Sequence, residues 1–177
     1  LRLDAGIVIS ASHNPFEDNG IKIFSHEGFK LSDEVEENIE SMVADQGFPP
    51  KRPSCDKIGK AFRLDDATGR YIEYIKSTIP RGMDLEGLKV VVDSANGAAY
   101  KITSWLLREL GAEVVSINDK PDGTNINNNC GSLHLNALSK AVKAAVAHEG
   151  VAQDVYADRT LFEDDKGNAD DEDIVIG

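Results

Sequence analysis

Two polar turns in this sequence of 177 residues carry side chains that suit phosphoryl chemistry. The first turn spans residues 11–15, directly after the apolar stretch Gly6–Ser10, and places Ser12 beside His13. An exposed serine hydroxyl can carry a phosphoryl group when cations and backbone N–H groups hold the charge, and Lys22 follows nearby. Serine next to histidine is common in turns, so the residues alone favour a structural role for this pair.

The second turn is the acidic stretch Asp154–Arg159. If this segment is extended, alternate residues share a face, so Asp154 and Asp158 point the same way with Tyr156 between them. Two carboxylates in this arrangement suit a hard divalent cation such as Mg²⁺, which prefers oxygen ligands. An EF-hand is excluded, because Arg159 stands where that loop requires glycine. Taken alone, these residues favour an acidic surface strand.

Strands alternating with helices must position both turns. Gly6–Ser10 is a β-branched run typical of a buried parallel strand, and residues 21–24 predict the next strand. Further on, we expect a strand at 88–92, a helix at 98–110 with Trp105 on its inner face, a strand at 113–117, a helix at 136–148 that Gly150 terminates, and a strand near 151–152. This order predicts an α/β fold of doubly wound parallel or mixed sheets, whose ligands bind beyond the carboxyl ends of the strands.

Composition narrows the classes of protein. A net charge of −12 argues against a nucleic-acid partner, and the longest apolar runs are too short to span a membrane. Cys55 and Cys130 lie far apart, which argues against a disulfide framework or a zinc site and favours the cytoplasm. The first residues include neither an initiator Met nor a signal peptide, so we expect a piece of a longer protein, with a linker near Pro80.

Longer motifs around the two turns resemble a known enzyme family. Ala11–Pro15 (Ala-Ser-His-Asn-Pro) followed by Asp18–Lys22 (Asp-Asn-Gly-Ile-Lys) resembles the phosphoserine signature of the α-D-phosphohexomutases. The phrases at residues 91–100, 121–127 and 130–132 are similar to the same family, most closely to its bacterial phosphoglucosamine mutase branch. The resemblance covers essentially the whole chain.

The resemblance implies two Rossmann-like mutase domains: residues 1–80 as the C-terminal part of the phosphoserine domain, and residues 81–177 as a second domain with a metal-binding loop. It implies an isomerase that interconverts glucosamine 6-phosphate and glucosamine 1-phosphate through a phosphoserine and a bisphosphate. Ser12 would carry the phosphate and bind Mg²⁺ together with Asp154 and Asp158. The resemblance assigns His13 and Lys22 to acid–base or polar assistance and Arg159 to phosphate binding. It also suggests a homodimer for the full-length parent.

The metal loop departs from the family pattern. Val155 stands for a glycine and Tyr156 for the middle aspartate of Asp-Gly-Asp-x-Asp-Arg. A neutral phenol is a poor substitute for a carboxylate, so we expect weakened Mg²⁺ binding. If the family glycine has a positive φ, Val155 should be strained.

Three alternatives to a phosphoglucosamine mutase stay open. The parent enzyme could be a phosphomannomutase or a phosphoglucomutase, and the chain could also be a degenerate, non-catalytic binding remnant. We expect the isolated chain to be inactive on sugar phosphates. Asp93 and Asn96 we expect to be structural, since Asx side chains commonly close such turns.

Overall fold

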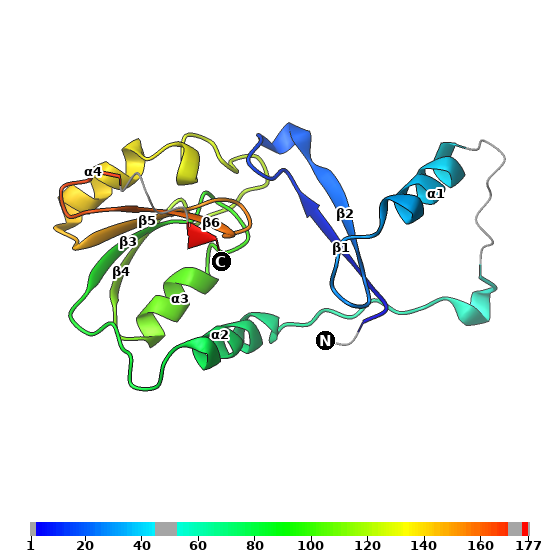
Figure 1. Ribbon diagram of the computed structural model, residues 1–177, viewed down its shortest axis with the longest axis horizontal. Helices are drawn as coiled ribbons and strands as arrows, with labels where there is room; N and C mark the ends of the chain where they lie inside the picture. Colours follow the sequence, from blue (N-terminus) through cyan, green and yellow to red (C-terminus); the bar gives the residue numbers. More distant parts are fainter. Residues whose placement is uncertain (1–2, 45–52, 170–174, 177) are drawn as a thin grey trace. The chain divides into compact units, whose positions relative to one another are not determined.

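The structure is a computed structural model that describes residues 3–44, 53–169 and 175–176. Its helices and strands follow in the order β1 (Ala5–Ser10), β2 (Gly20–Ser25), α1 (Asp33–Ala44), α2 (Ala67–Thr78), β3 (Lys89–Asp93), α3 (Ile102–Glu109), β4 (Glu113–Ile117), α4 (Asn136–Ala145), β5 (Glu149–Gln153), β6 (Arg159–Glu163) and β7 (Val175–Ile176) (Figure 1). Within the described ranges, no helix is long and apolar enough to cross a membrane.

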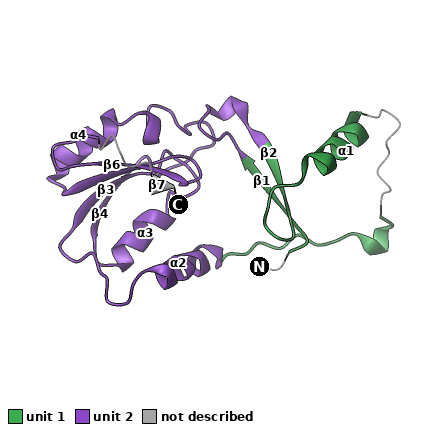
Figure 2. Ribbon diagram, viewed as in Figure 1, with its two compact units in different colours: residues 1–9, 21–65 green, residues 10–20, 66–177 purple. Residues whose placement is uncertain are grey.

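The chain forms two compact units (Figure 2). The first contains residues 1–9 and 21–65, and the second contains residues 10–20 and 66–177. The turn that carries Ser12 therefore belongs to the same unit as the acidic turn after β5. The domain boundary expected near Pro80 stays a prediction.

In the first unit, β1 and β2 form a two-stranded sheet. The expectation of a buried strand at Gly6–Ser10 is wrong, because Ile7 and Ile9 are 67% and 71% exposed. The β-branched residues do favour a strand, but burial depends on what packs against its faces, and that is not encoded in the run itself.

The second unit is built on a five-stranded sheet in the order β4-β3-β5-β6-β7. The strands β4, β3 and β5 are parallel, whereas β6 runs antiparallel to β5 and β7 runs antiparallel to β6. The observed sheet is therefore mixed, which confirms the α/β prediction. Because β3 and β5 are parallel neighbours, their carboxyl ends bring the turns after Asp93 and Gln153 to the same edge of the sheet.

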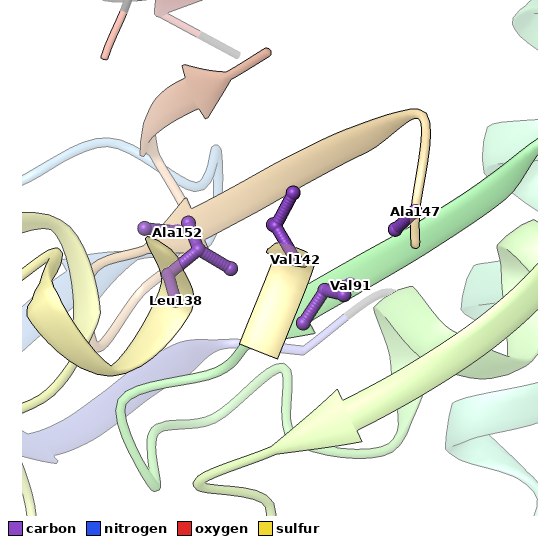
Figure 3. Close-up of a cluster of buried hydrophobic side chains, with 5 residues drawn as sticks. All are labelled: Val91, Leu138, Val142, Ala147 and Ala152. Atoms are coloured by element: carbon purple, nitrogen blue, oxygen red, sulfur yellow. The ribbon is translucent and has the colours of Figure 1, made fainter. Parts of the chain in front are cut away.

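Alternating side chains of β3 and β5 form two hydrophobic layers. Figure 3 shows one layer, in which Val91 and Ala152 of the sheet cluster with Leu138, Val142 and Ala147 on the α4 side. On the other face, Val90, Val92 and Val151 pack with Leu107 of α3 and with neighbouring strands. Helices on both faces hold the strand ends, and thereby the turns, in fixed positions.

Gly150 does not terminate α4, contrary to the expectation. The helix ends at Val146, which has a left-handed φ of +52°, and Gly150 lies within β5. A Cβ at Gly150 would stand only 2.7 Å from Cγ2 of Val142. The glycine is needed because α4 packs closely on β5 at this point.

The helix expected at 98–110 begins later, and Trp105 is not on its inner face. Trp105 is 45% exposed, whereas Ser104 is buried and its hydroxyl lies 2.8 Å from the hydroxyl of Ser116 on β4. Residues 97–101 form turns before α3 begins. The face of α3 that packs against the sheet therefore contains Ser104 and not the adjacent Trp105.

Candidate active site

The Ser12 turn places the hydroxyl next to the imidazole of the following residue. Ser12 has a left-handed φ of +55°, and its Oγ lies 3.3 Å from Nδ1 of His13. The N–H of Ser12 donates to Oγ of Ser10 at 2.9 Å, and the N–H of Asn14 closes the turn on the carbonyl of Ala11 at 3.0 Å. Ser12 is half-buried and His13 is exposed. A serine held in this way can exchange a proton with imidazole as it reacts.

A residue far along the sequence holds this turn. Nδ2 of Asn127 donates to the carbonyls of Ser12 at 3.0 Å and Asn14 at 2.9 Å. The N–H of Asn127 donates to the carbonyl of Ala95 in the turn after β3. Sequence reasoning missed this role, because the loop around Asn127 contains several asparagines and nothing in their spacing selects one.

The turn after β3 is closed by buried polar side chains, as expected for Asp93 and Asn96. Oδ1 of Asp93 accepts from the N–H of Ala95, and Oδ2 accepts from Nδ2 of Asn118, both at 2.9 Å. Nδ2 of Asn96 donates to the carbonyl of Asn125 at 3.1 Å. Burial raises the pKa of Asp93, and these donors oppose that rise. These bonds close the turn at residues 93–98, which we call the platform.

The acidic turn after β5 is a tight hairpin and not the extended segment expected. The N–H of Asp154 donates to the carbonyl of Arg159 at 3.1 Å, and the N–H of Ala157 donates back to the carbonyl of Asp154 at 3.1 Å. Oδ1 of Asp154 also accepts from the N–H of Asp158 at 3.2 Å. The two carboxylates are brought together by this folded turn instead of by strand alternation.

The electrostatics of this hairpin suit a cation. Burial raises the pKa of Asp154 most, and the adjacent Asp158 carboxylate raises it further, while the N–H groups of Arg159 and Asp158 oppose the rise. Two acids that destabilise each other's charge form an oxygen donor set that Mg²⁺ would stabilise. Two carboxylates thus fit the metal, but the described part of the chain contains no group of three acidic, His or Cys side chains able to hold one.

Val155 is not strained. The left-handed residue of the hairpin is Ala157, with a φ of +58°, while Val155 is buried. The expectation of strain at Val155 is therefore wrong. The backbone of Val155 instead contacts the platform: its carbonyl accepts from the N–H of Ala98 at 2.8 Å, and its Cα would lie 2.7 Å from a Cβ at Gly97.

Tyr156 lies between the two acidic residues of the hairpin and is half-buried. It lines a cavity of about 350 Å³ together with residues of α2 and α3, among them Tyr71, Ile75 and Leu106. The hairpin therefore contains two carboxylates, those of Asp154 and Asp158, and a phenol between them.

The remaining predicted site residues lie in different places. Arg159 is exposed and begins β6, one residue after Asp158. Lys22 is exposed on β2 in the first compact unit. In the second unit, the platform after β3 contacts Asn127, which holds the Ser12 turn, and Val155 of the acidic hairpin. Contacts through the turn after β3 thus connect the Ser12 turn with the acidic hairpin.

Two family models match the chain. Residues 1–49 match the phosphoglucomutase/phosphomannomutase α/β/α domain I, and residues 69–167 match domain II of the same family.

Curated relatives and solved structures are also similar. The phosphoglucosamine mutases of Thermodesulfovibrio yellowstonii and Citrifermentans bemidjiense are 61% and 54% identical over 99% of this chain. The chain spans 39% of the length of each of these relatives. A phosphoglucomutase/phosphomannomutase family protein from Burkholderia thailandensis superposes with a TM-score of 0.72 at 28% identity, over 96% of this chain and 35% of that one.

Proposed function

Because the chain belongs to the phosphoglucomutase/phosphomannomutase family of α-D-phosphohexomutases, we propose that the full-length protein that contains it acts as a phosphoglucosamine mutase, converting glucosamine 6-phosphate to glucosamine 1-phosphate and back. The high identity to proteins named phosphoglucosamine mutase supports this choice of sugar over mannose or glucose. The observation that carries the chemistry is the Ser12 hydroxyl, placed 3.3 Å from Nδ1 of His13 in a turn held by Asn127.

In the proposed reaction, Ser12 takes up and gives back a phosphoryl group. When Oγ attacks the phosphorus of a sugar bisphosphate, the Oγ–P bond forms and the bond from phosphorus to the sugar oxygen breaks. Nδ1 of His13 accepts the hydroxyl proton, and the leaving sugar oxygen ends up protonated. In the reverse transfer, the phosphoserine gives its phosphoryl group to the free hydroxyl of a sugar monophosphate, which regenerates the bisphosphate and the Ser12 hydroxyl. When Ser12 then takes the phosphate from the other position of that bisphosphate, the isomer is released. Lys22 and Arg159 supply positive charge for phosphate oxygens in this proposal.

Asp154 and Asp158 are the residues that would hold Mg²⁺, with the phosphate on Ser12 as a further oxygen ligand. When bound, the ion would offset negative charge on the transferring phosphoryl group. The raised pKa of Asp154 supports this assignment, since it reports a buried carboxylate beside a second acid. The hydrogen-bonded hairpin positions both acids before any ion binds.

The test is the half-reaction at Ser12. The purified chain is incubated with glucose 1,6-bisphosphate and Mg²⁺, and its intact mass is followed by peptide mapping. We expect one phosphate-sized increment on Ser12, which is absent from Ser12→Ala and removed by phosphatase. If the mass stays unchanged at every bisphosphate concentration, the protein is better described as the non-catalytic binding remnant, an alternative that Tyr156 favours because it replaces an acidic residue of the family's metal loop.

A further inference from the structure

The carboxamide of Asn127 restrains the Ser12 turn from outside the turn. One nitrogen atom, Nδ2, donates to the carbonyl of Ser12 at 3.0 Å and to that of Asn14 at 2.9 Å. These carbonyls flank His13 in the sequence. The two bonds therefore fix both ends of the short segment that carries the nucleophile and its histidine neighbour.

The conformation of Ser12 needs such a restraint. A left-handed φ of +55° costs a non-glycine residue about 1 kcal/mol or more, and it persists only where the surroundings enforce it. Within the turn, the N–H of Ser12 and the N–H of Asn14 make local bonds. Neither of these bonds uses the carbonyl of Ser12, which is the atom that Asn127 holds.

Asn127 is itself firmly anchored. Its N–H donates at 3.1 Å to the carbonyl of Ala95, a fully buried residue of the platform after β3. Asn127 has a φ of +56°, a conformation that asparagine tolerates better than most residues. Asn127 thus connects the Ser12 turn to the turn after β3.

We propose that Asn127 is a positioning residue, which keeps Ser12 left-handed so that Oγ stays beside Nδ1 of His13 and open to an incoming phosphoryl group. The inference rests on the proposed function. Asn127 acts through the backbone carbonyls of the turn, since its amide contacts those carbonyls and not the Ser12 hydroxyl.

The test compares Asn127→Gly with Asn129→Gly in the full chain. Glycine accepts a positive φ, so each change deletes a carboxamide without straining the backbone. Asn129 is the matched control, because it also has a left-handed φ, of +54°, and its side chain donates to the exposed Asn128. Asn127→Asp is a second variant that keeps the size and removes the donor.

The main readout is the rate of phosphate transfer from glucose 1,6-bisphosphate to Ser12, measured by intact mass over a range of bisphosphate concentrations. Two lost hydrogen bonds predict a saturated rate about tenfold lower or more in both Asn127 variants. The half-saturating concentration should stay the same, and Asn129→Gly should match the wild-type protein. A partly unfolded variant would instead lower the final fraction of labelled protein and leave the rate constant of the folded fraction unchanged.

Hydrogen exchange at the Asn14 amide gives an independent readout. In the Asn127 variants this amide should lose protection, while amides of β3 keep theirs. Equal transfer rates in Asn127→Gly and the wild-type protein would overturn the inference. If the wild-type chain takes up no phosphate, the proposed function fails, and the inference then stands or falls on whether Asn14 exchanges faster in Asn127→Gly.

Discussion

Asp93 ends β3, and Asp154 follows β5, the parallel neighbour of β3, so the two carboxylates begin turns at the same edge of one sheet. Both are buried, with exposed fractions of 0% and 8%, and burial raises the pKa of both. Around Asp93, the N–H of Ala95 and the amide of Asn118 supply hydrogen-bond donors. Around Asp154, the nearest side-chain partner is another acid, Asp158.

Two carboxylates at the same edge of one sheet thus lie in opposite electrostatic surroundings, one among hydrogen-bond donors and one beside a second acid. Both oxygens of Asp93 accept hydrogen bonds, and these bonds close the turn around its charge. The paired acids after β5 leave negative charge that only a cation or a proton relieves. Changes to the turn at Asp93 should therefore lower stability, whereas changes to the acidic hairpin should alter cation binding.

The largest expected effect on stability comes from Asp93→Asn. The change replaces one carboxylate oxygen by an NH₂ group, which cannot accept the hydrogen bond that this oxygen accepts. We therefore expect the free energy of unfolding to fall by about 3 kcal/mol. Asp154→Asn is the matched control and should lose less than about 1 kcal/mol, because it removes a repulsion. Urea denaturation at neutral pH measures both. If both variants lost the same free energy of unfolding, the two carboxylates would not differ in their contribution to stability.

Tyr156→Asp sharpens the contrast from the side of the metal. A third carboxylate in the hairpin should tighten Mg²⁺ binding about tenfold, since affinity follows the number of charged ligands. Titration calorimetry gives the dissociation constants, and Tyr156→Phe should bind like the wild-type protein. An unchanged affinity in Tyr156→Asp would show that two carboxylates already complete the site or that the hairpin does not bind the ion.

Asp158→Asn tests the pH dependence of the hairpin. The pKa of Asp154 is raised in the fold, so its contribution to stability is full below the ordinary value of 3.8 and is lost as the pH rises through the folded pKa. Removing the second acid should reduce that loss. The variant should be as stable as the wild-type protein at pH 3 and about 0.5 kcal/mol more stable at pH 7 without Mg²⁺. Thermal melts from pH 3 to pH 7 measure the difference in stability between the two proteins. A difference that does not change with pH would contradict the prediction.

The smallest effect concerns the backbone of the hairpin. Ala157→Gly should raise stability by about 0.5 kcal/mol, because alanine at a φ of +58° is strained and glycine is not. Val155→Gly should instead lower stability, since Val155 is buried and has no positive φ. Denaturation curves that show a gain at Val155 and a loss at Ala157 would reverse the assignment.

Much of the second unit follows from local sequence. The bounds of β4 and the position of β3 to within one residue were predicted, because short apolar β-branched runs that alternate with helical patterns are typical of strands in an α/β fold. The structural role of Asp93 was also predicted from turn chemistry. Residue types alone identified the two turns whose side chains suit phosphoryl chemistry. The family motifs added Mg²⁺ binding and the roles of Lys22 and Arg159, and these stay predictions.

Features that depend on distant partners were not predictable. The exposure of Ile7 and Ile9 depends on what covers the sheet of β1 and β2, and the contact of Asn127 with Ser12 joins segments far apart in the chain. The hairpin at residues 154–158 was mistaken for an extended segment, because alternating acids look the same in both. Its antiparallel return into β6 is set by pairing with β5, which no local pattern specifies.

The most direct test of the account is whether phosphate transfer to Ser12 depends on Mg²⁺ through the acidic hairpin. Transfer from glucose 1,6-bisphosphate is followed by intact mass with Mg²⁺ or with EDTA, in the wild-type protein and in Asp158→Asn. If the hairpin holds Mg²⁺ that assists the transfer, Ser12 should be labelled rapidly with Mg²⁺ and at least tenfold more slowly with EDTA or in Asp158→Asn. Labelling at the same rate in all three samples would contradict the account.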